Sequence, residues 1–162
     1  MNHAGTTPGG PAAGRPLICR PPLLFAAAIA AGVVLHLVWP LSFTLGAARW
    51  PIGATLSIAG VAMFAAAVRA FAAAGTPVPG SQSATAIVGR GPYRFSRNPI
   101  YVAFVLFHLG IAVFVGSWWL VITLAASVSV IAIAVVPREE QYLEARFGPT
   151  YSTYKSSVRR WL

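Results

Sequence analysis

The longest apolar stretch of the chain runs from Ile100 to Val136 and contains no charged residue. As a single α-helix, a stretch of this length would measure about 55 Å, at about 1.5 Å per residue. The hydrocarbon layer of a bilayer is only about 30 Å thick. The stretch must therefore fold back on itself, and we predict the turn at Gly116-Ser117. The products are two predicted transmembrane helices, 100–115 and 118–136.

Two further apolar stretches lie nearer the N-terminus, at residues 23–45 and 51–74. Each is long enough to cross a bilayer, which takes about 20 residues. The first exceeds the apolar core of a signal peptide, which is about 7–15 residues, and further spans follow it. Residues 1–22 are rich in Gly and Pro, contain no acidic residue, and predict a disordered tail. We therefore expect an all-α membrane protein with four transmembrane helices in a single domain, residues 23–162.

Charge predicts the orientation of these spans. The chain carries 12 Lys and Arg against 3 Asp and Glu. A basic chain can bind nucleic acid, but these basic residues fall between apolar segments, so we expect no nucleic-acid partner. With four spans, every basic residue except Arg49 falls on the side of both termini and the 75–99 loop. Because basic residues accumulate in cytoplasmic loops, this side is predicted to be cytoplasmic, in a bacterial inner membrane. The opposite side carries a predicted aromatic belt of Trp39, Trp50, Trp118 and Trp119.

The only acidic residues are Glu139, Glu140 and Glu144, which follow the last predicted span. Pro137 is suited to the start of a helix, where the helix dipole favours negative charge. Further along, apolar and basic residues recur at helical spacing, which predicts an amphipathic segment in the membrane interface. We expect the tail 137–162 to be this cytoplasmic amphipathic helical segment. Taken alone, the acidic residues could simply form surface ion pairs, which stabilise proteins little.

A second polar cluster, GRGPYRFSRNPIY at residues 89–101, immediately precedes the long apolar stretch. It concentrates arginine and tyrosine residues in a chain that is otherwise largely apolar. The hairpin predicted for residues 100–136 brings its own two ends together. This loop and the acidic pair Glu139-Glu140 are therefore expected at the same cytoplasmic mouth.

The residue types available narrow the chemistry. One cysteine and three scattered histidines do not suggest a metal site, and the sequence lacks a Ser-His-acid set and a phosphate-binding loop. His36 and His108 fall within predicted spans, where a functional role and a helix-packing role both stay open. A reaction that depends on positioning remains, and methyl transfer from a sulfonium donor is one. Such a donor needs carboxylates for its ammonium or ribose hydroxyls, and aromatic surface for its adenine and sulfonium.

The stretch GPYRFSRNPIY, followed by two apolar spans and then EEQYLEARFGPTYSTYKSSVRRWL, resembles the isoprenylcysteine carboxyl methyltransferase and phospholipid methyltransferase superfamily. The signature of that superfamily is G-x-Y-x-x-x-R-H-P-x-Y, a helical hairpin, and E-E-x-x-L followed by F-G-x-x-Y-x-x-Y. The resemblance covers about residues 85–160. Asn98 stands where the signature has histidine, and asparagine can donate and accept hydrogen bonds but cannot carry a charge.

The resemblance implies S-adenosylmethionine as the methyl donor, bound at the cytoplasmic mouth by both motifs. It makes Arg138 and Glu140 the candidate catalytic residues, and it implies no metal. Arg94 and Arg97 are further candidates for the donor pocket. The residues that the resemblance implies for donor binding are Ala86, Ile87, Val88, Tyr93, Asn98, Pro99, Ile100, Tyr101 and Glu139.

We therefore expect an integral membrane methyltransferase that uses S-adenosylmethionine and acts on a lipophilic acceptor, such as an isoprenoid carboxylate or thiol. Its expected partners are this lipophilic small molecule or lipid substrate and the membrane lipids. Two alternatives stay open. The acceptor can be a phospholipid amine, since Val135 stands where eukaryotic prenylcysteine enzymes carry a carboxylate-binding arginine. Otherwise the chain is a non-enzymatic membrane assembly or transport protein.

Overall fold

The structure is a computed structural model that describes residues 20–78 and 84–162. Within these ranges it is all-helical, which confirms the predicted all-α class. The predicted tail 1–22 lies outside the described residues as far as residue 19. The main helices are α1 (Pro21–Val38), α2 (Arg49–Ala73), α3 (Pro99–Val115), α4 (Trp118–Val130), α5 (Val136–Phe147) and α6 (Pro149–Ser157). Shorter segments are the 3-10 helices η1 (Gly46–Ala48) and η2 (Gly91–Arg94) and the π-helical segment η3 (Ile131–Val135).

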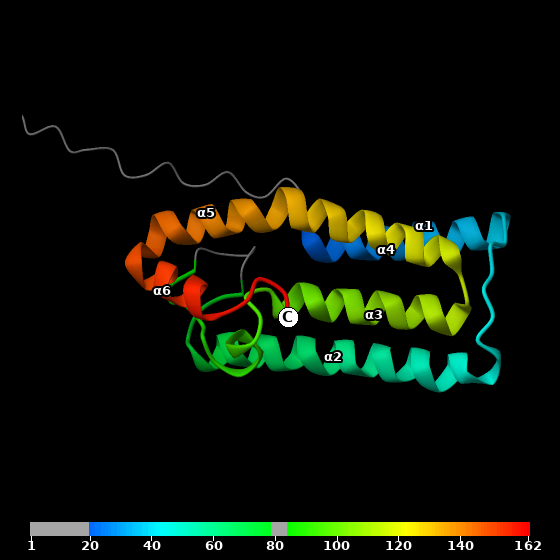
Figure 1. The fold of residues 1–162 in the computed structure, drawn as a ribbon, viewed down its shortest axis with the longest axis horizontal. Coiled ribbons are helices and arrows are strands. Elements are labelled where there is room, and N and C mark those ends of the chain that lie inside the picture. The colour runs from blue at the N-terminus through cyan, green and yellow to red at the C-terminus, as the bar shows by residue number, and fades with distance from the viewer. Residues whose placement is uncertain (1–19, 79–83) are drawn as a thin grey trace, which may run out of the picture.

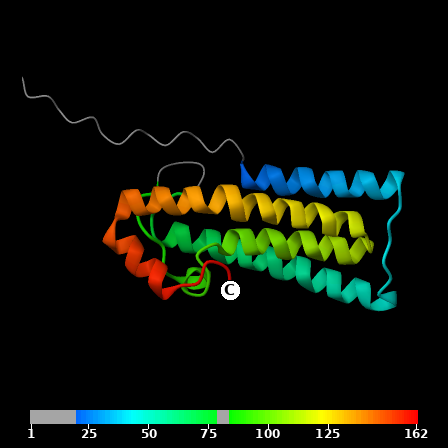
Figure 2. The ribbon, with the colours of Figure 1, turned by 45° about the horizontal axis from the view of Figure 1, so that its top comes forward.

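Three helical segments are long and apolar enough to cross a membrane, namely Pro21–Val38, Gly46–Ala73 and Trp118–Phe147. Helix α3 is also apolar, but it has only 17 residues. Helices α1 to α4 lie side by side as a bundle, and α5 extends beyond the bundle in line with α4 (Figures 1 and 2). These apolar helices indicate an integral membrane protein, because a helix satisfies its own backbone hydrogen bonds within lipid.

Helix α1 ends at Val38, which is earlier than the end of the predicted first span, 23–45. Pro40 explains the difference, because a proline disfavours helical geometry in the residue before it. The chain beyond Pro40 instead runs along the turn between α3 and α4. There the backbone N–H of Phe43 donates a hydrogen bond of 2.9 Å to the carbonyl of Gly116.

Helices α2 and α3 approach each other so closely that glycines are needed between them. A Cβ atom on Gly53 would lie 2.8 Å from the carbonyl oxygen of Gly110, and one on Gly60 would lie 2.7 Å from the backbone nitrogen of Phe107. Small residues allow such close packing of backbones in membranes, where packing replaces the hydrophobic effect as the cause of helix association. The contact fixes α3, and with it the polar loop that precedes Pro99, against α2.

Gly116 ends helix α3 in the left-handed conformation, with φ of 73°, and α4 begins at Trp118. Glycine adopts this conformation without the steric cost that a Cβ atom would add. The turn predicted at Gly116-Ser117 is thereby confirmed.

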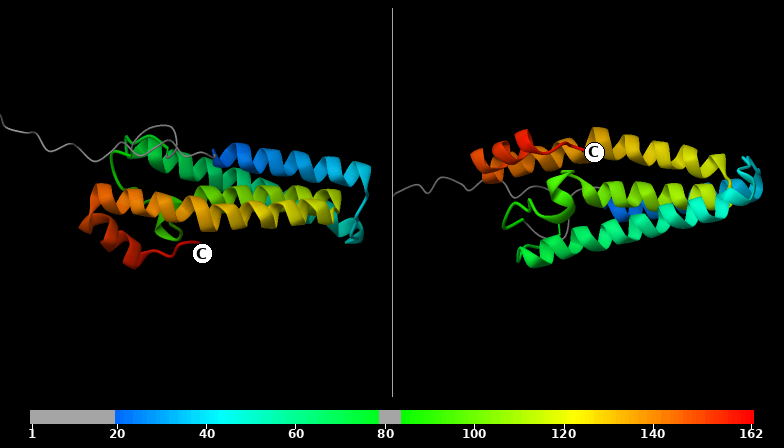
Figure 3. Two further views of the ribbon diagram at one scale, coloured as in Figure 1. Left: turned by 90° about the horizontal axis from the view of Figure 1, so that it is seen from above. Right: turned by 60° about the horizontal axis from the view of Figure 1, so that its bottom comes forward.

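Helix α4 does not end where the predicted span 118–136 ends. It passes through η3 into α5 as one continuous rod (Figure 3). Pro137 lacks a backbone N–H and cannot complete the hydrogen bond to the preceding turn. The π-helical segment lies directly before this proline, and local π geometry is one way in which membrane helices accommodate proline. Because the rod is continuous, α4 sets the direction in which the α5 carboxylates project.

Gly148, with φ of 51°, separates α5 from α6. Helix α6 turns back toward the bundle, and the C-terminus lies beside the start of α3 (Figure 1). The polar loop, the start of α3, and the helices α5 and α6 therefore gather at one end of the bundle.

Candidate functional site

Tyr101 and Glu139 join the two polar motifs. Tyr101 lies in the first turn of α3 and Glu139 in the first turn of α5. The Tyr101 hydroxyl donates a hydrogen bond of 2.8 Å to Oε1 of Glu139. The Tyr101 ring is buried and packs with Ile131 and Val135 in an apolar cluster. The hairpin thus brings the loop and the acidic pair together, as the sequence predicts.

Glu140 is the most buried of the three acidic residues, with 6% of its surface exposed. Arg97 Nη1 lies 3.0 Å from its Oε1. Arg160 donates two hydrogen bonds, from Nε to Oε1 at 3.1 Å and from Nη2 to Oε2 at 2.6 Å. Both carboxylate oxygens therefore have guanidinium partners, and these contacts give Glu140 a structural role, joining the loop, α5 and the C-terminal end of the chain.

Residues 158–162, which we call the C-terminal strap, pair with the polar loop. The backbone N–H of Arg97 donates a hydrogen bond of 2.9 Å to the carbonyl of Arg159. The side-chain amide of Asn98 donates one of 2.9 Å to the carbonyl of Arg160, while Ser96 Oγ accepts one of 3.1 Å from the Asn98 backbone N–H. Asn98, predicted to bind the donor, is therefore engaged with the strap.

Sequence reasoning missed Ser96 and Arg160 as members of this site. One sequence signal was available for Arg160. All acidic residues of the chain are clustered after the last span, so basic residues at the C-terminus have few possible partners. No sequence signal identified Ser96, because its contacts depend on the backbone pairing of the strap.

Tyr93 and Tyr154 form the second tyrosine contact of the site. The Tyr154 hydroxyl donates a hydrogen bond of 2.8 Å to the carbonyl of Tyr93, and the Tyr93 ring packs edge-on against Phe71 at 5.0 Å. Burial raises the pKa of Tyr93 far above its ordinary value, and the nearby Tyr154 and Glu139 raise it further. Burial also raises the pKa of Tyr154 to about 12. Both phenols are therefore neutral at physiological pH and can act as hydrogen-bond donors.

The remaining predicted donor-binding residues lie close to Tyr93 or at the start of α3. Val88 is buried in one cluster with Tyr93, and Ile100 packs against this cluster. Pro99 is fully buried at the first position of α3. Ala86 and Ile87 are partly buried and lie in the irregular segment before η2.

Arg138, the other candidate catalytic residue, is exposed on α5. Among the described residues, the ion pairs do not include it. His108 is fully buried, with its ring edge-on to Phe25 at 6.3 Å, which is a helix-packing contact. Over the described ranges, no group of three His, Cys, Asp or Glu side chains could hold a metal ion.

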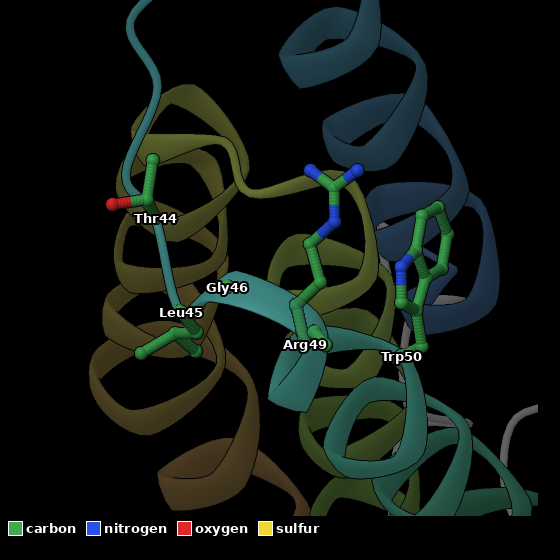
Figure 4. A pocket seen from close by; sticks show the side chains of 6 residues that line it. Thr44, Leu45, Gly46, Arg49 and Trp50 are labelled. Carbon is green, nitrogen blue, oxygen red and sulfur yellow. The ribbon is translucent and has the colours of Figure 1, made fainter.

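The opposite end of the bundle has a shallow pocket of about 280 Å³ between η1 and the start of α2. There Arg49 and Trp50 project from the start of α2 (Figure 4), and the Arg49 guanidinium carbon lies 4.3 Å from the Trp50 ring centroid. All of the predicted site residues lie at the other end, so this pocket is separate from them. The lining residues are Thr44, Leu45, Gly46, Ala47, Arg49 and Trp50.

A sequence model described as phospholipid methyltransferase matches residues 48–150 of the chain. The chain belongs to the phospholipid methyltransferase family. This family is part of the isoprenylcysteine carboxyl methyltransferase-like superfamily of membrane methyltransferases, which confirms the resemblance seen in the sequence. The matched range includes α2 to α5, the polar loop and the acidic pair, whereas α1 and the C-terminal strap lie outside it.

The chain is also similar to an uncharacterized protein of Haemophilus influenzae, with 59% identity over 27 residues. The similarity covers 17% of this chain and 43% of that protein, so the chain matches less than half the length of this relative. No solved structure matches the chain.

Proposed function

We propose that this chain is an integral membrane methyltransferase that takes its methyl group from S-adenosylmethionine. The observation that carries the proposal is the hydrogen bond between Tyr101 and Glu139, because it joins the two motifs at one end of the bundle. The family match supports the reaction class.

The residue types at this end fit such a donor. Among the described contacts, only Oε1 of Glu139 takes part in a hydrogen bond, so Oε2 can accept from an ammonium or a ribose hydroxyl. Tyr93 and Tyr101 supply aromatic surface for the adenine or the sulfonium. Ala86, Ile87 and Val88 supply backbone donors and acceptors, and the Asn98-Pro99-Ile100-Tyr101 turn completes the set.

The donor supplies a methyl group on a positively charged sulfur. The acceptor lone pair forms the new bond to the methyl carbon as the carbon–sulfur bond breaks, and that electron pair returns to sulfur. An amine acceptor then loses one proton, whereas a thiolate or carboxylate loses none. The chain contributes mainly alignment and exclusion of water. In this proposal Arg138 and Glu140 are the residues nearest to the acceptor chemistry, with Glu140 acting through the arginines that it holds.

We further propose four spans, with both termini at the cytoplasmic face of a bacterial inner membrane. Helix α3 packs lengthwise against α2, and a helix of its length measures about 26 Å, which a small local thinning of the bilayer accommodates. The described basic residues other than Arg49 lie toward the end with α5 and α6, as expected for a cytoplasmic face. In a chain with Cys19 replaced by serine, an Ala47→Cys variant should react with an impermeant maleimide in intact cells. Ser156→Cys should react only after the membrane is opened.

The acceptor enters laterally from the bilayer in this proposal. The family match favours a phospholipid amine over an isoprenoid carboxylate or thiol. Val135 favours it too, because this position is buried in an apolar cluster and offers no charge to a carboxylate.

Transfer of a labelled methyl group tests this choice. The full chain in nanodiscs would be supplied with methyl-labelled S-adenosylmethionine, once with phosphatidylethanolamine and once with a farnesylated thiol or carboxylate. We expect label in the phosphatidylethanolamine fraction. Label only in the isoprenoid fraction would overturn the amine acceptor and leave the donor proposal intact. Label in neither fraction, together with absent donor binding, would favour the non-enzymatic alternative.

A further inference from the structure

A second hollow lies at the same end of the bundle as the candidate site, on the outer side of the C-terminal strap. Its volume is about 310 Å³. It lies between the polar loop and the strap, close to the C-terminus that Figure 1 marks beside the start of α3. The lining residues are Arg94, Phe95, Ser157, Val158, Arg159 and Leu162.

The backbone pairing of strap and loop sorts the arginines into two groups. Val158 has extended geometry, with φ of −127° and ψ of 134°, and successive side chains of an extended segment point to opposite sides. Arg160 accordingly reaches Glu140, whereas Arg159 lines the hollow. In the loop, Arg97 pairs with the same carboxylate, while Arg94 lines the hollow.

The two outer arginines have no carboxylate available to them within the chain. The whole sequence contains 3 acidic residues. Glu139 accepts a hydrogen bond from Tyr101, and Glu144 lies 2.7 Å from Lys155. Glu140 is shared by the two inner arginines. An anion that neutralises the exposed Arg94 and Arg159 must therefore come from outside the chain.

Two apolar side chains at the hollow are unusually exposed. Phe95 is 70% exposed, and so is Leu162. Phe95 lies only four residues before Pro99, where the apolar helix α3 begins, so the hollow lies within about 15 Å of the membrane span. Lipid headgroups occupy this depth. A ligand with both an anionic group and apolar chains matches the paired arginines and the exposed apolar side chains.

We propose that this hollow is a binding site for an anionic phospholipid, with its phosphate between Arg94 and Arg159 and its acyl chains against Phe95 and Leu162. The site is distinct from the acceptor site, because the strap separates it from Glu139 and Glu140. It does not depend on methyl transfer, so its test can fail or succeed independently of the proposed enzyme activity. Binding there would hold the strap, and the loop paired with it, at the membrane surface.

Native mass spectrometry of the full chain tests the proposal. The detergent-purified protein would be exposed to equal amounts of phosphatidylglycerol and phosphatidylcholine with identical acyl chains. We expect the wild type to retain phosphatidylglycerol preferentially. The double variant Arg94→Gln/Arg159→Gln should reduce that preference about thirtyfold, since each arginine near an anionic membrane surface contributes about a factor of five.

The matched control is Arg69→Gln/Arg146→Gln, which removes the same charge from two other exposed positions at this end. It should change the preference less than threefold. Phe95→Ala should weaken retention of both lipids and leave the preference intact. Thermal unfolding would verify that all variants stay folded.

Three results would overturn the proposal. One is a wild type that retains both lipids equally. Another is a control that loses as much preference as the test variant, because general charge attraction would then explain binding. The third is displacement of phosphatidylglycerol by excess inorganic phosphate, which would make free phosphate the ligand.

Discussion

The Tyr101 hydroxyl donates a hydrogen bond of 2.8 Å to Glu139, across a sequence separation of 38 residues. This contact depends on three features of the chain: the Gly116 turn, the close packing of α3 on α2, and the continuity of α4 with α5. It leaves one carboxylate held by a neutral phenol beside the buried Tyr93 ring. That arrangement is the basis of the proposed donor site.

Replacing Glu140 with glutamine should destabilise the protein strongly. The change leaves the Arg97 guanidinium, whose side chain is 10% exposed, without its charged partner. Breaking a buried ion pair typically costs about 3–5 kcal/mol of unfolding free energy, and denaturant titration in detergent would measure it. The control is Glu144→Gln, because its pair with Lys155 is solvent-exposed and should contribute little. Equal losses in both variants would contradict the structural role of Glu140.

Replacing Gly60 with valine should separate α2 from α3. The new Cβ atom would lie 2.7 Å from the backbone nitrogen of Phe107, which cannot move without shifting the helix. Overpacking of this kind costs about 1–3 kcal/mol, seen as a lower unfolding temperature. Ala62→Val on the same helix is the control, because Ala62 is exposed. A larger loss in the control would show that the helix contact is misplaced.

The sequence was sufficient for the helical class, the hairpin turn and the meeting of the two motifs, because apolar length and glycine chemistry decide these features locally. It was insufficient for the C-terminal strap. The strap has only short irregular backbone pairing, and its register depends on where α6 ends, which hydrophobic periodicity does not specify. For the same reason Asn98 was assigned to the donor, whereas its amide bonds the carbonyl of Arg160.

Replacing Asn98 with alanine should loosen the strap. The lost hydrogen bond to Arg160 is worth about 1 kcal/mol, so amide hydrogen exchange in residues 158–162 should accelerate roughly fivefold. Asn98→His can restore a donor at this position and should recover part of the protection. Unchanged exchange in the alanine variant would contradict the role of Asn98 in holding the strap.

Tyr154 should titrate late. Burial raises its pKa from 10.0 to about 12, so the folded state holds this proton more tightly than the unfolded state. The stability that results is complete below pH 10 and is lost as the pH rises from about 10 to 12. The phenolate absorbance of the wild type minus that of Tyr154→Phe should show a transition near pH 12. A transition near pH 10 would show that Tyr154 is not buried against the loop.

Isothermal titration of the purified full chain with S-adenosylmethionine tests the central claim most directly. We expect binding of micromolar strength that weakens about tenfold or more in Glu139→Gln, because a hydrogen bond to a charged group is worth about 1.5–3 kcal/mol. Tyr93→Ala should weaken it as well, through lost aromatic surface, and Glu144→Gln should bind like the wild type. Absent binding, or binding that neither Glu139→Gln nor Tyr93→Ala affects, would contradict the donor site proposed here.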